Sequence, residues 1–155
     1  MAIHAIFRSD NMSGTVHGKH LVSVRMTEDL DNGLVIVPGA LEAGEREVRV
    51  YAAPSADATI GKIAILGSEE VDTGATYDTV GGFYNKKGTI ARAYILEHED
   101  IFSVSAEGWK AVPAVGDTVK VAAGEMKLGT AGDITIGECI AIEQDGNTTW
   151  YVVRV

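Results

Sequence analysis

Histidines near the start of the chain are the first residues that could carry chemistry, because imidazole is a common protein ligand for metal ions. His17 and His20 lie three residues apart, and His4 lies upstream of them. In an extended segment this spacing places the two side chains on different faces. No cysteine or carboxylate lies nearby at a spacing typical of metal ligands. We therefore expect no metal site.

The acidic stretch 28–33 has the composition of a calcium-binding loop without its spacing. The stretch reads Glu-Asp-Leu-Asp-Asn-Gly. A calcium loop that used Gly33 as its turn glycine would need an oxygen ligand at the position of Leu30. The pattern therefore fails as a calcium site, and Asn32-Gly33 is typical of a turn instead.

Residues that could act in catalysis lack the local settings they need. Ser103 and Ser105 fall in an expected strand rather than in the sharp Gly-x-Ser-x-Gly turn that exposes a catalytic serine. Cys139 follows a glutamate, whose charge would raise the pKa of the thiol rather than activate it. His98 lies in a charged turn, and no glycine-rich loop opens a helix to hold phosphate. We expect no enzyme, no catalytic residue and no cofactor.

A lysine in the final third of the chain could in principle carry a covalent group. The segments 115–120 and 124–128, which contain Gly116-Asp117 and Lys127, resemble the biotinyl or lipoyl carrier domain, in which a modified lysine lies at a hairpin tip. Only ten residues separate Gly116 from Lys127, and Glu125 stands where that family has alanine. A carrier domain stays an alternative. Gly116-Asp117 is common wherever a turn opens a small β-barrel, so it supports that architecture more than the modification.

Strand patterns dominate the chain, and helix patterns are scarce. Residues 21–26 alternate, so that Val22, Val24 and Met26 share one face. Residues 34–37 are wholly apolar and end at Pro38-Gly39, which fits a buried strand. Further strands are expected over residues 47–51, 60–66, 89–96, 101–105 and 118–123.

The last part of the chain predicts a hairpin. Asp145-Gly146 lies between two β-rich runs, and glycine tolerates the positive φ that a twist-matching turn needs. Gly137 is a candidate for a bulge or bend in the first strand. Parity along that strand places four isoleucines on one face: Ile134, Ile136, Ile140 and Ile142.

These patterns predict an all-β protein whose antiparallel strands form a compact β-sandwich or barrel-like body. We expect an extended N-terminal arm over residues 1–20, a main β domain over residues 21–110, and a small C-terminal barrel or hairpin lobe over residues 111–155. The arm is polar and contains glycine, so we expect it to become ordered only where a partner binds it. No apolar run approaches the ~20 residues that cross a bilayer, so no membrane partner is expected.

Net charge limits the classes of partner, and cysteine content indicates the compartment of synthesis. The 155 residues carry a net charge of −9, which argues against a nucleic-acid partner because phosphate contacts require clustered lysine and arginine. Residues 1–26 carry three basic side chains against one acidic, whereas the rest of the chain carries ten against 21. A basic arm on an acidic body could dock on an acidic surface. The single cysteine cannot form an internal disulfide, which suggests synthesis in a reducing cytoplasm.

Turn residues and short apolar runs alternate from residue 31 onward. The motifs are residues 31–37, 44–48, 83–88, 91–96, 99–105, 114–117 and the final hairpin. Their order resembles small head-associated structural proteins of tailed bacteriophages, the class that decorates capsids, especially in phages of Gram-positive hosts. The resemblance implies a virion structural protein made in the host cytoplasm, most directly a capsid decoration protein that binds and stabilises the outer surface of the mature head.

The same resemblance implies partners and leaves alternatives. The partner would be the lattice of the major capsid protein, and a homo-oligomer such as a trimer would suit the three-fold positions of that lattice. The alternative hypothesis is another phage structural component, such as a tail-tube or head-completion protein, because these proteins also use β-barrels. Nothing in the residues counts subunits.

Four residues are candidates for partner binding. Arg8 and Lys19 lie on the expected arm, which could reach across a seam between capsomers. Phe83 and Tyr84 lie between Gly81-Gly82 and the polar stretch 85–88, and an aromatic pair at a loop tip could anchor an interface. Core packing is the other interpretation of this pair, and the one that a following strand favours.

Overall fold

The computed structural model describes residues 3–70 and 80–155, and it confirms the all-β prediction. Five strands close into a barrel in the order β2-β4-β3-β5-β6. Their bounds are Leu21–Arg25 (β2), Val35–Leu41 (β3), Val48–Ala52 (β4), Ala64–Leu66 (β5) and Ile90–Ile95 (β6). All neighbouring barrel strands are antiparallel except β2 and β4, which are parallel.

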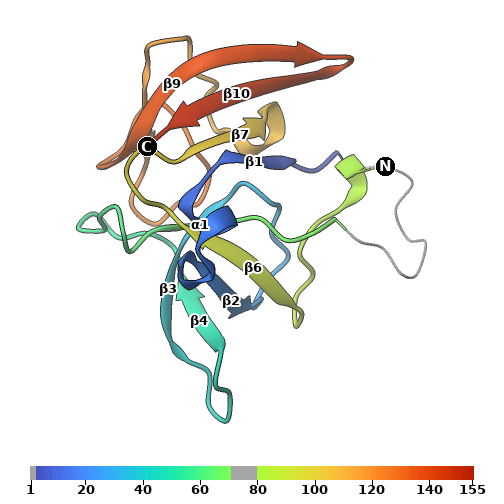
Figure 1. The fold of residues 1–155 in the computed structure, drawn as a ribbon, viewed down its shortest axis with the longest axis vertical. Coiled ribbons are helices and arrows are strands. Elements are labelled where there is room, and N and C mark those ends of the chain that lie inside the picture. The colour runs from blue at the N-terminus through green and yellow to red at the C-terminus, as the bar shows by residue number, and fades with distance from the viewer. Residues whose placement is uncertain (1–2, 71–79) are drawn as a thin grey trace.

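The other five strands form an open antiparallel sheet that lies beside the barrel (Figure 1). Its order is β1-β7-β10-β9-β8, so it combines the N-terminal strand with the C-terminal hairpin. The bounds are Phe7–Asn11 (β1), Ile101–Ser105 (β7), Thr118–Val121 (β8), Ile134–Asp145 (β9) and Thr148–Arg154 (β10). Four helical turns lie between strands within the described residues: Ser13–Val16 (α1), Gly18–His20 (η1), Val80–Gly82 (η2) and Ala106–Gly108 (η3). Across the described ranges, no helix has the length and apolar character to cross a membrane.

Strand β5 belongs to the barrel and is buried on both faces, so its side chains pack both inside the barrel and under the open sheet. Ala64 and Leu66 belong to the apolar cluster that fills the barrel. Ile65 belongs instead to the larger cluster under the open sheet, which also contains Phe102 of β7. A strand covered on both sides must be apolar at every position, which explains the unbroken run Ala-Ile-Leu. Two apolar clusters therefore lie on opposite faces of β5, one inside the barrel and one between the barrel and the open sheet.

The N-terminal segment is not the extended arm that its composition predicted. Residues 7–11 form β1, which pairs with β7 so that Phe7 lies opposite Val104. Ala5 and Met12 are 2% and 1% exposed, so the segment also contributes to the core. Its polar side chains find polar partners in the body, as when the Ser103 hydroxyl donates to Asp10. The N-terminal segment is therefore attached to the body although its apolar content is low. Residues 1 and 2 of the expected arm lie outside the described residues.

The open sheet also crosses the expected boundary between residues 110 and 111. Strands β1 and β7 precede this boundary, and β8, β9 and β10 follow it, yet all five hydrogen-bond in one sheet. The division of the chain into independent domains stays a prediction.

The C-terminal hairpin forms as expected, with Gly146 at a φ of +58° in its turn. The shared face of the four isoleucines ends at Gly137. Ile136 is 2% exposed, whereas Ile142 is 43% exposed and Cys139 lies in the core. A Cβ on Gly137 would lie 2.1 Å from the carbonyl oxygen of Arg154, so only glycine permits this approach. The pairing of β9 shifts register with both neighbouring strands, and such a bulge reverses the parity of the side chains.

The remaining strand predictions hold with changed ends. In β2, Val24 and the adjacent Met26 are buried on the predicted face. Strand β3 does not stop before Pro38-Gly39 but continues to Leu41, with a register shift opposite β4 that accommodates the proline.

Candidate functional site

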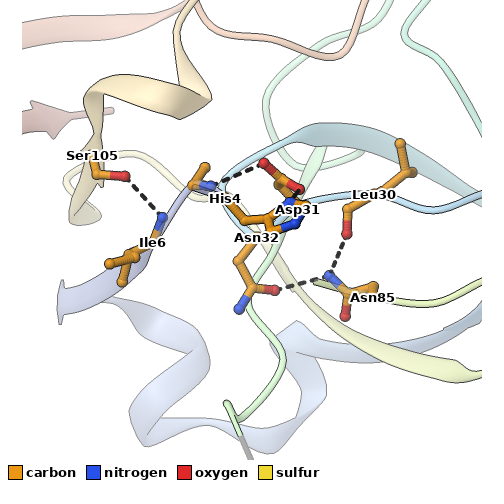
Figure 2. Close-up of polar contacts among 8 residues, drawn as sticks. His4, Ile6, Leu30, Asp31, Asn32, Asn85 and Ser105 are labelled. Carbon is orange, nitrogen blue, oxygen red and sulfur yellow. Dashed lines mark hydrogen bonds and ion pairs between the residues drawn. The ribbon is translucent and has the colours of Figure 1, made fainter. Parts of the chain in front are cut away.

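Residues 4–13, here termed the N-terminal latch, are attached to the body by side chains from other segments. His4 Nδ1 lies 2.6 Å from Asp31 Oδ1, and the backbone N–H of Ala5 donates to Asp31 Oδ2 at 2.9 Å. The N–H of Ile6 donates to the Ser105 hydroxyl oxygen at 2.9 Å (Figure 2). One carboxylate and one hydroxyl therefore fix three consecutive residues at the start of the latch.

Asp100 fixes the other end of the latch. Its carboxylate accepts the N–H of Ser13 at 2.8 Å, the hydroxyl of Ser13 at 2.9 Å and the N–H of Glu97 at 2.9 Å. The residue is only 2% exposed. A buried carboxylate is tolerated where hydrogen-bond donors surround it, and here the donors belong to two segments far apart in the chain. Asp100 thereby joins the start of α1 to the turn before β7.

Two buried asparagines hold the loop that follows η2. Asn85 Nδ2 donates to the carbonyl of Leu30 and to Asn32 Oδ1, each at 3.0 Å, and Figure 2 shows both contacts. Asn32 in turn exchanges two hydrogen bonds with the backbone of Ser68, at 2.9 and 3.0 Å. Asn32 and Asn85 are 1% and 3% exposed, and the two hydrogen bonds donated by Asn85 are buried. This network fixes the backbone on which Phe83 and Tyr84 lie.

Three of the four sequence-predicted partner-binding residues are engaged within the molecule. Arg8 Nη2 lies 3.0 Å from Glu143 Oε2, and the Arg8 guanidinium lies 4.0 Å from the ring centroid of Trp150. Tyr84 stacks on His4 with ring centroids 4.7 Å apart. Phe83 and Tyr84 are half-buried. These contacts give Arg8 and Tyr84 structural roles in attaching the latch.

The fourth residue, Lys19, lines a surface groove of about 510 Å³ beside β2 and the β3–β4 hairpin. Arg46 and Arg49 enter the same groove from the β3–β4 hairpin, which projects from the body (Figure 1). Leu21 and Leu41 contribute apolar walls. Lys19 and Arg46 are exposed, and Arg49 is half-buried. This surface, lined by Lys19, Arg46, Arg49 and their apolar neighbours, is termed the cationic groove.

Arg46 and Arg49 of the groove differ in their partners from the four other arginines of the described residues, each of which forms an ion pair. Five cationic side chains elsewhere lie 2.7 to 3.9 Å from a glutamate oxygen: Arg8, Arg25, Arg92, Lys110 and Arg154. No carboxylate within residues 3–70 and 80–155 forms such an ion pair with Lys19, Arg46 or Arg49. Glu47 also lines the groove, which leaves an excess of two positive charges in a chain of net −9.

Sequence reasoning missed Arg46 and Arg49 because acidic residues alternate with them. The stretch 45–49 reads Glu-Arg-Glu-Val-Arg, which is electrically neutral as a sequence. In the structure Glu45 lies 3.6 Å from Arg25 on the neighbouring strand and so belongs to a different set of charges. The hairpin geometry therefore separates charges that the sequence places side by side.

The three histidines considered as metal ligands do not meet. His4 contacts Asp31, and His20 Nδ1 lies 3.4 Å from Glu97 Oε1. His17 and His20 have ring centroids 6.3 Å apart. In the part of the chain that the structure describes, no three histidine, cysteine or acidic side chains are grouped so that they could hold a metal ion.

Comparison with known proteins gives one structural likeness. No protein-family model matches the chain, and no curated protein matches it. A solved structure described as the head fiber gp8.5 N base of bacteriophage phi29 is similar, with a TM-score of 0.47 and 12% sequence identity. The match covers 86% of this chain and 92% of that chain. A likeness at this level carries no argument about function.

Proposed function

We propose that this protein is a structural component of a tailed-phage virion, and specifically a capsid decoration protein that binds the outer surface of the mature head. The sequence resemblance of residues 31–155 to head-associated proteins supports the class. The observation that carries a binding role is the cationic groove, because Lys19, Arg46 and Arg49 form no ion pair with the described carboxylates. Such a groove on an acidic body offers a defined contact for an acidic protein surface.

The proposed mechanism is thermodynamic linkage. A ligand that binds only the assembled lattice stabilises that lattice, by about 2.7 kcal/mol per site when its concentration is a hundredfold above the dissociation constant. A protein that contacted two capsomers at once would place this energy at the seam between them. A specific contact of this kind buries on the order of 1,000 Å² or more.

The latch changes which part of the protein would make the contact. Residues 7–11 already pair in the open sheet, so they are not available to reach across a seam as a free arm. The contact surface would instead belong to the body. A preformed surface loses little conformational entropy on binding, which favours affinity. The lattice of the major capsid protein would be the partner, and a trimer would suit its three-fold positions.

Co-sedimentation with phage particles tests the proposal. Purified protein is mixed with mature heads that lack it, with unexpanded procapsids and with isolated tails. Saturable binding to mature heads is the expected result. Absence of binding to both kinds of head would overturn the proposal, and binding to tails alone would favour a tail component.

A further inference from the structure

We infer that the cationic groove binds an extended acidic segment of a partner protein, one in which carboxylates alternate with apolar side chains. The inference rests on the proposed function only in taking the phage head as the particle that carries this segment. The chemistry of the segment follows from the groove itself.

The charge of the groove specifies acidic side chains. Lys19 belongs to η1, whereas Arg46 and Arg49 belong to the β3–β4 hairpin, so the positive charge of the groove comes from two segments of the chain. At physiological ionic strength charges are screened over about 8 Å, so carboxylates seated between these side chains interact with them far more than with the distant acidic body. An acidic segment therefore finds in this groove a local charge opposite to that of the whole chain.

The walls of the groove specify apolar side chains between the carboxylates. Leu21 and Ile95 line the groove and are half-buried, and Leu41 is 53% exposed beside them. An exposed leucine adjacent to arginines is covered most effectively by a segment that brings its own apolar groups. Consecutive side chains of an extended peptide point in opposite directions, so an alternating segment can present carboxylates and apolar groups to different parts of the groove.

A second surface groove shows that this combination is not a general property of the molecule. That groove has a volume of about 240 Å³ and is lined by Met12, Val16, His98 and Asp100 among others. It contains Glu99 and Asp100 but no lysine or arginine. Charge complementarity to an acidic segment is therefore present in the cationic groove and absent from this second groove.

The composition of the groove argues against nucleic acid as the occupant. Binding to a phosphate backbone draws on clustered lysine and arginine, and each contact releases counterions. Here Glu47 shares the groove with three cations, and the chain as a whole carries −9. A densely charged strand would extend beyond the groove onto this acidic surface and be repelled.

Two probes test the inference, so that the test does not depend on phage heads alone. The first is mature heads, measured by co-sedimentation. The second is a short fluorescein-labelled peptide of alternating glutamate and leucine, measured by anisotropy at low and at physiological salt. The test variant is R46E/R49E. The matched control is K62E/K127E, which makes the same change in charge at exposed lysines that do not line the groove.

We expect the wild type to bind the peptide, with affinity that falls as salt rises. R46E/R49E should bind the peptide and the heads at least about tenfold more weakly, whereas K62E/K127E should stay within about twofold of wild type. The neutral variant R46Q/R49Q should fall between them. Circular dichroism melting of each variant confirms that the fold is retained.

The outcomes separate the inference from the proposed function. If the wild type binds the peptide through the groove but does not bind heads, the inference holds and the proposed function fails. If heads bind R46E/R49E and K62E/K127E equally well, the proposed function holds and the inference is overturned. Absence of binding to both probes, preference for duplex DNA over the peptide, or an oligomer that R46E/R49E dissociates would also overturn it, the last by identifying a second copy of this chain as the occupant.

Discussion

The N-terminal latch and the cationic groove both present basic side chains, but those side chains differ in their partners. Arg8 in the latch lies over Trp150 and contacts Glu143. Lys19 and Arg49 in the groove form no ion pair with any described carboxylate. The comparison shows that the presence of basic residues in a segment does not identify a binding surface. Arg8, whose charge is matched by Glu143, contributes to structure, whereas the groove combines unmatched cations with a concave surface that a partner could enter.

This difference separates two kinds of experimental effect. Substitutions in and beside the latch should lower the free energy of unfolding, because they leave buried polar groups without partners. Substitutions of the groove arginines should weaken binding and leave stability almost unchanged, because these side chains form no ion pair with a described carboxylate. The predictions below test this separation, beginning with the largest expected effect.

The largest effect concerns the reactivity of Cys139. This residue lies on β9 of the open sheet and is 0% exposed in the core. Burial, with a contribution from neighbouring carboxylates, raises the pKa of this thiol above its usual value of 9.0. Because the thiolate is the reactive form, we expect modification by a disulfide reagent at pH 8 to be at least about a thousandfold slower in the native protein than in urea. The native rate should stay low as pH rises toward 9.

Absorbance assays of thiol release measure both rates. A native protein whose Cys139 reacted as fast as the urea-unfolded chain would contradict the burial of this residue. It would also show that the open sheet separates easily from the barrel.

Among substitutions in and beside the latch, Asp100→Ala should cause the largest loss of stability. The substitution removes the acceptor for the N–H groups of Ser13 and Glu97, and a buried group without a partner costs about 1–3 kcal/mol. We expect a total loss of about 3 kcal/mol, measured as a lower urea midpoint at an unchanged slope. The exposed Asp133 provides the control, since Asp133→Ala should change stability by less than about 0.5 kcal/mol. Equal midpoints for the two variants would refute the role of Asp100.

Arg8→Ala should have an intermediate effect. It removes a partly exposed ion pair to Glu143 and a cation–π contact with Trp150, which together are worth about 1 kcal/mol. Loss of the covering guanidinium should also shift the tryptophan fluorescence to longer wavelength. Arg154→Ala is the matched control, because Arg154 lies at the longer distance of 3.9 Å from Glu138. If both variants kept the wild-type spectrum and stability, Arg8 would not be a structural residue.

The smallest effect on stability belongs to the groove. R46Q/R49Q should stay within about 0.5 kcal/mol of wild type, because neither arginine forms an ion pair within the described part of the chain. Urea unfolding of the purified variant measures this directly. A loss above about 1 kcal/mol would mean that the arginines support the barrel, and the contrast between groove and latch would fail.

Much of the fold could be predicted because its strands follow local rules. The alternation of residues 21–26 and the Asp145-Gly146 turn depend on side-chain parity and on the φ that glycine allows, and both act within a few residues. The parity of β9 could not be followed past Gly137. The reversal there accompanies register shifts of β9 against β8 and β10, and these pairings join segments that are separate in the sequence.

The candidate site was less predictable because its contacts are long-range. Lys19 was identified from the basic character of the N-terminal segment, but Arg46 and Arg49 were hidden by adjacent glutamates. The latch was expected to be free because it is polar. Its partners, Asp31 and Asp100, lie 26 to 87 positions away in sequence and could not be paired with it by any local pattern.

Thermal melting of mature heads tests the central claim most directly. Heads that lack the protein are melted alone, with wild-type protein and with R46E/R49E. The account predicts that the wild type raises the melting temperature of the particles to a plateau at saturation and that R46E/R49E raises it much less at the same concentration. An unchanged melting temperature with saturating wild-type protein would contradict the proposal that this protein reinforces the head.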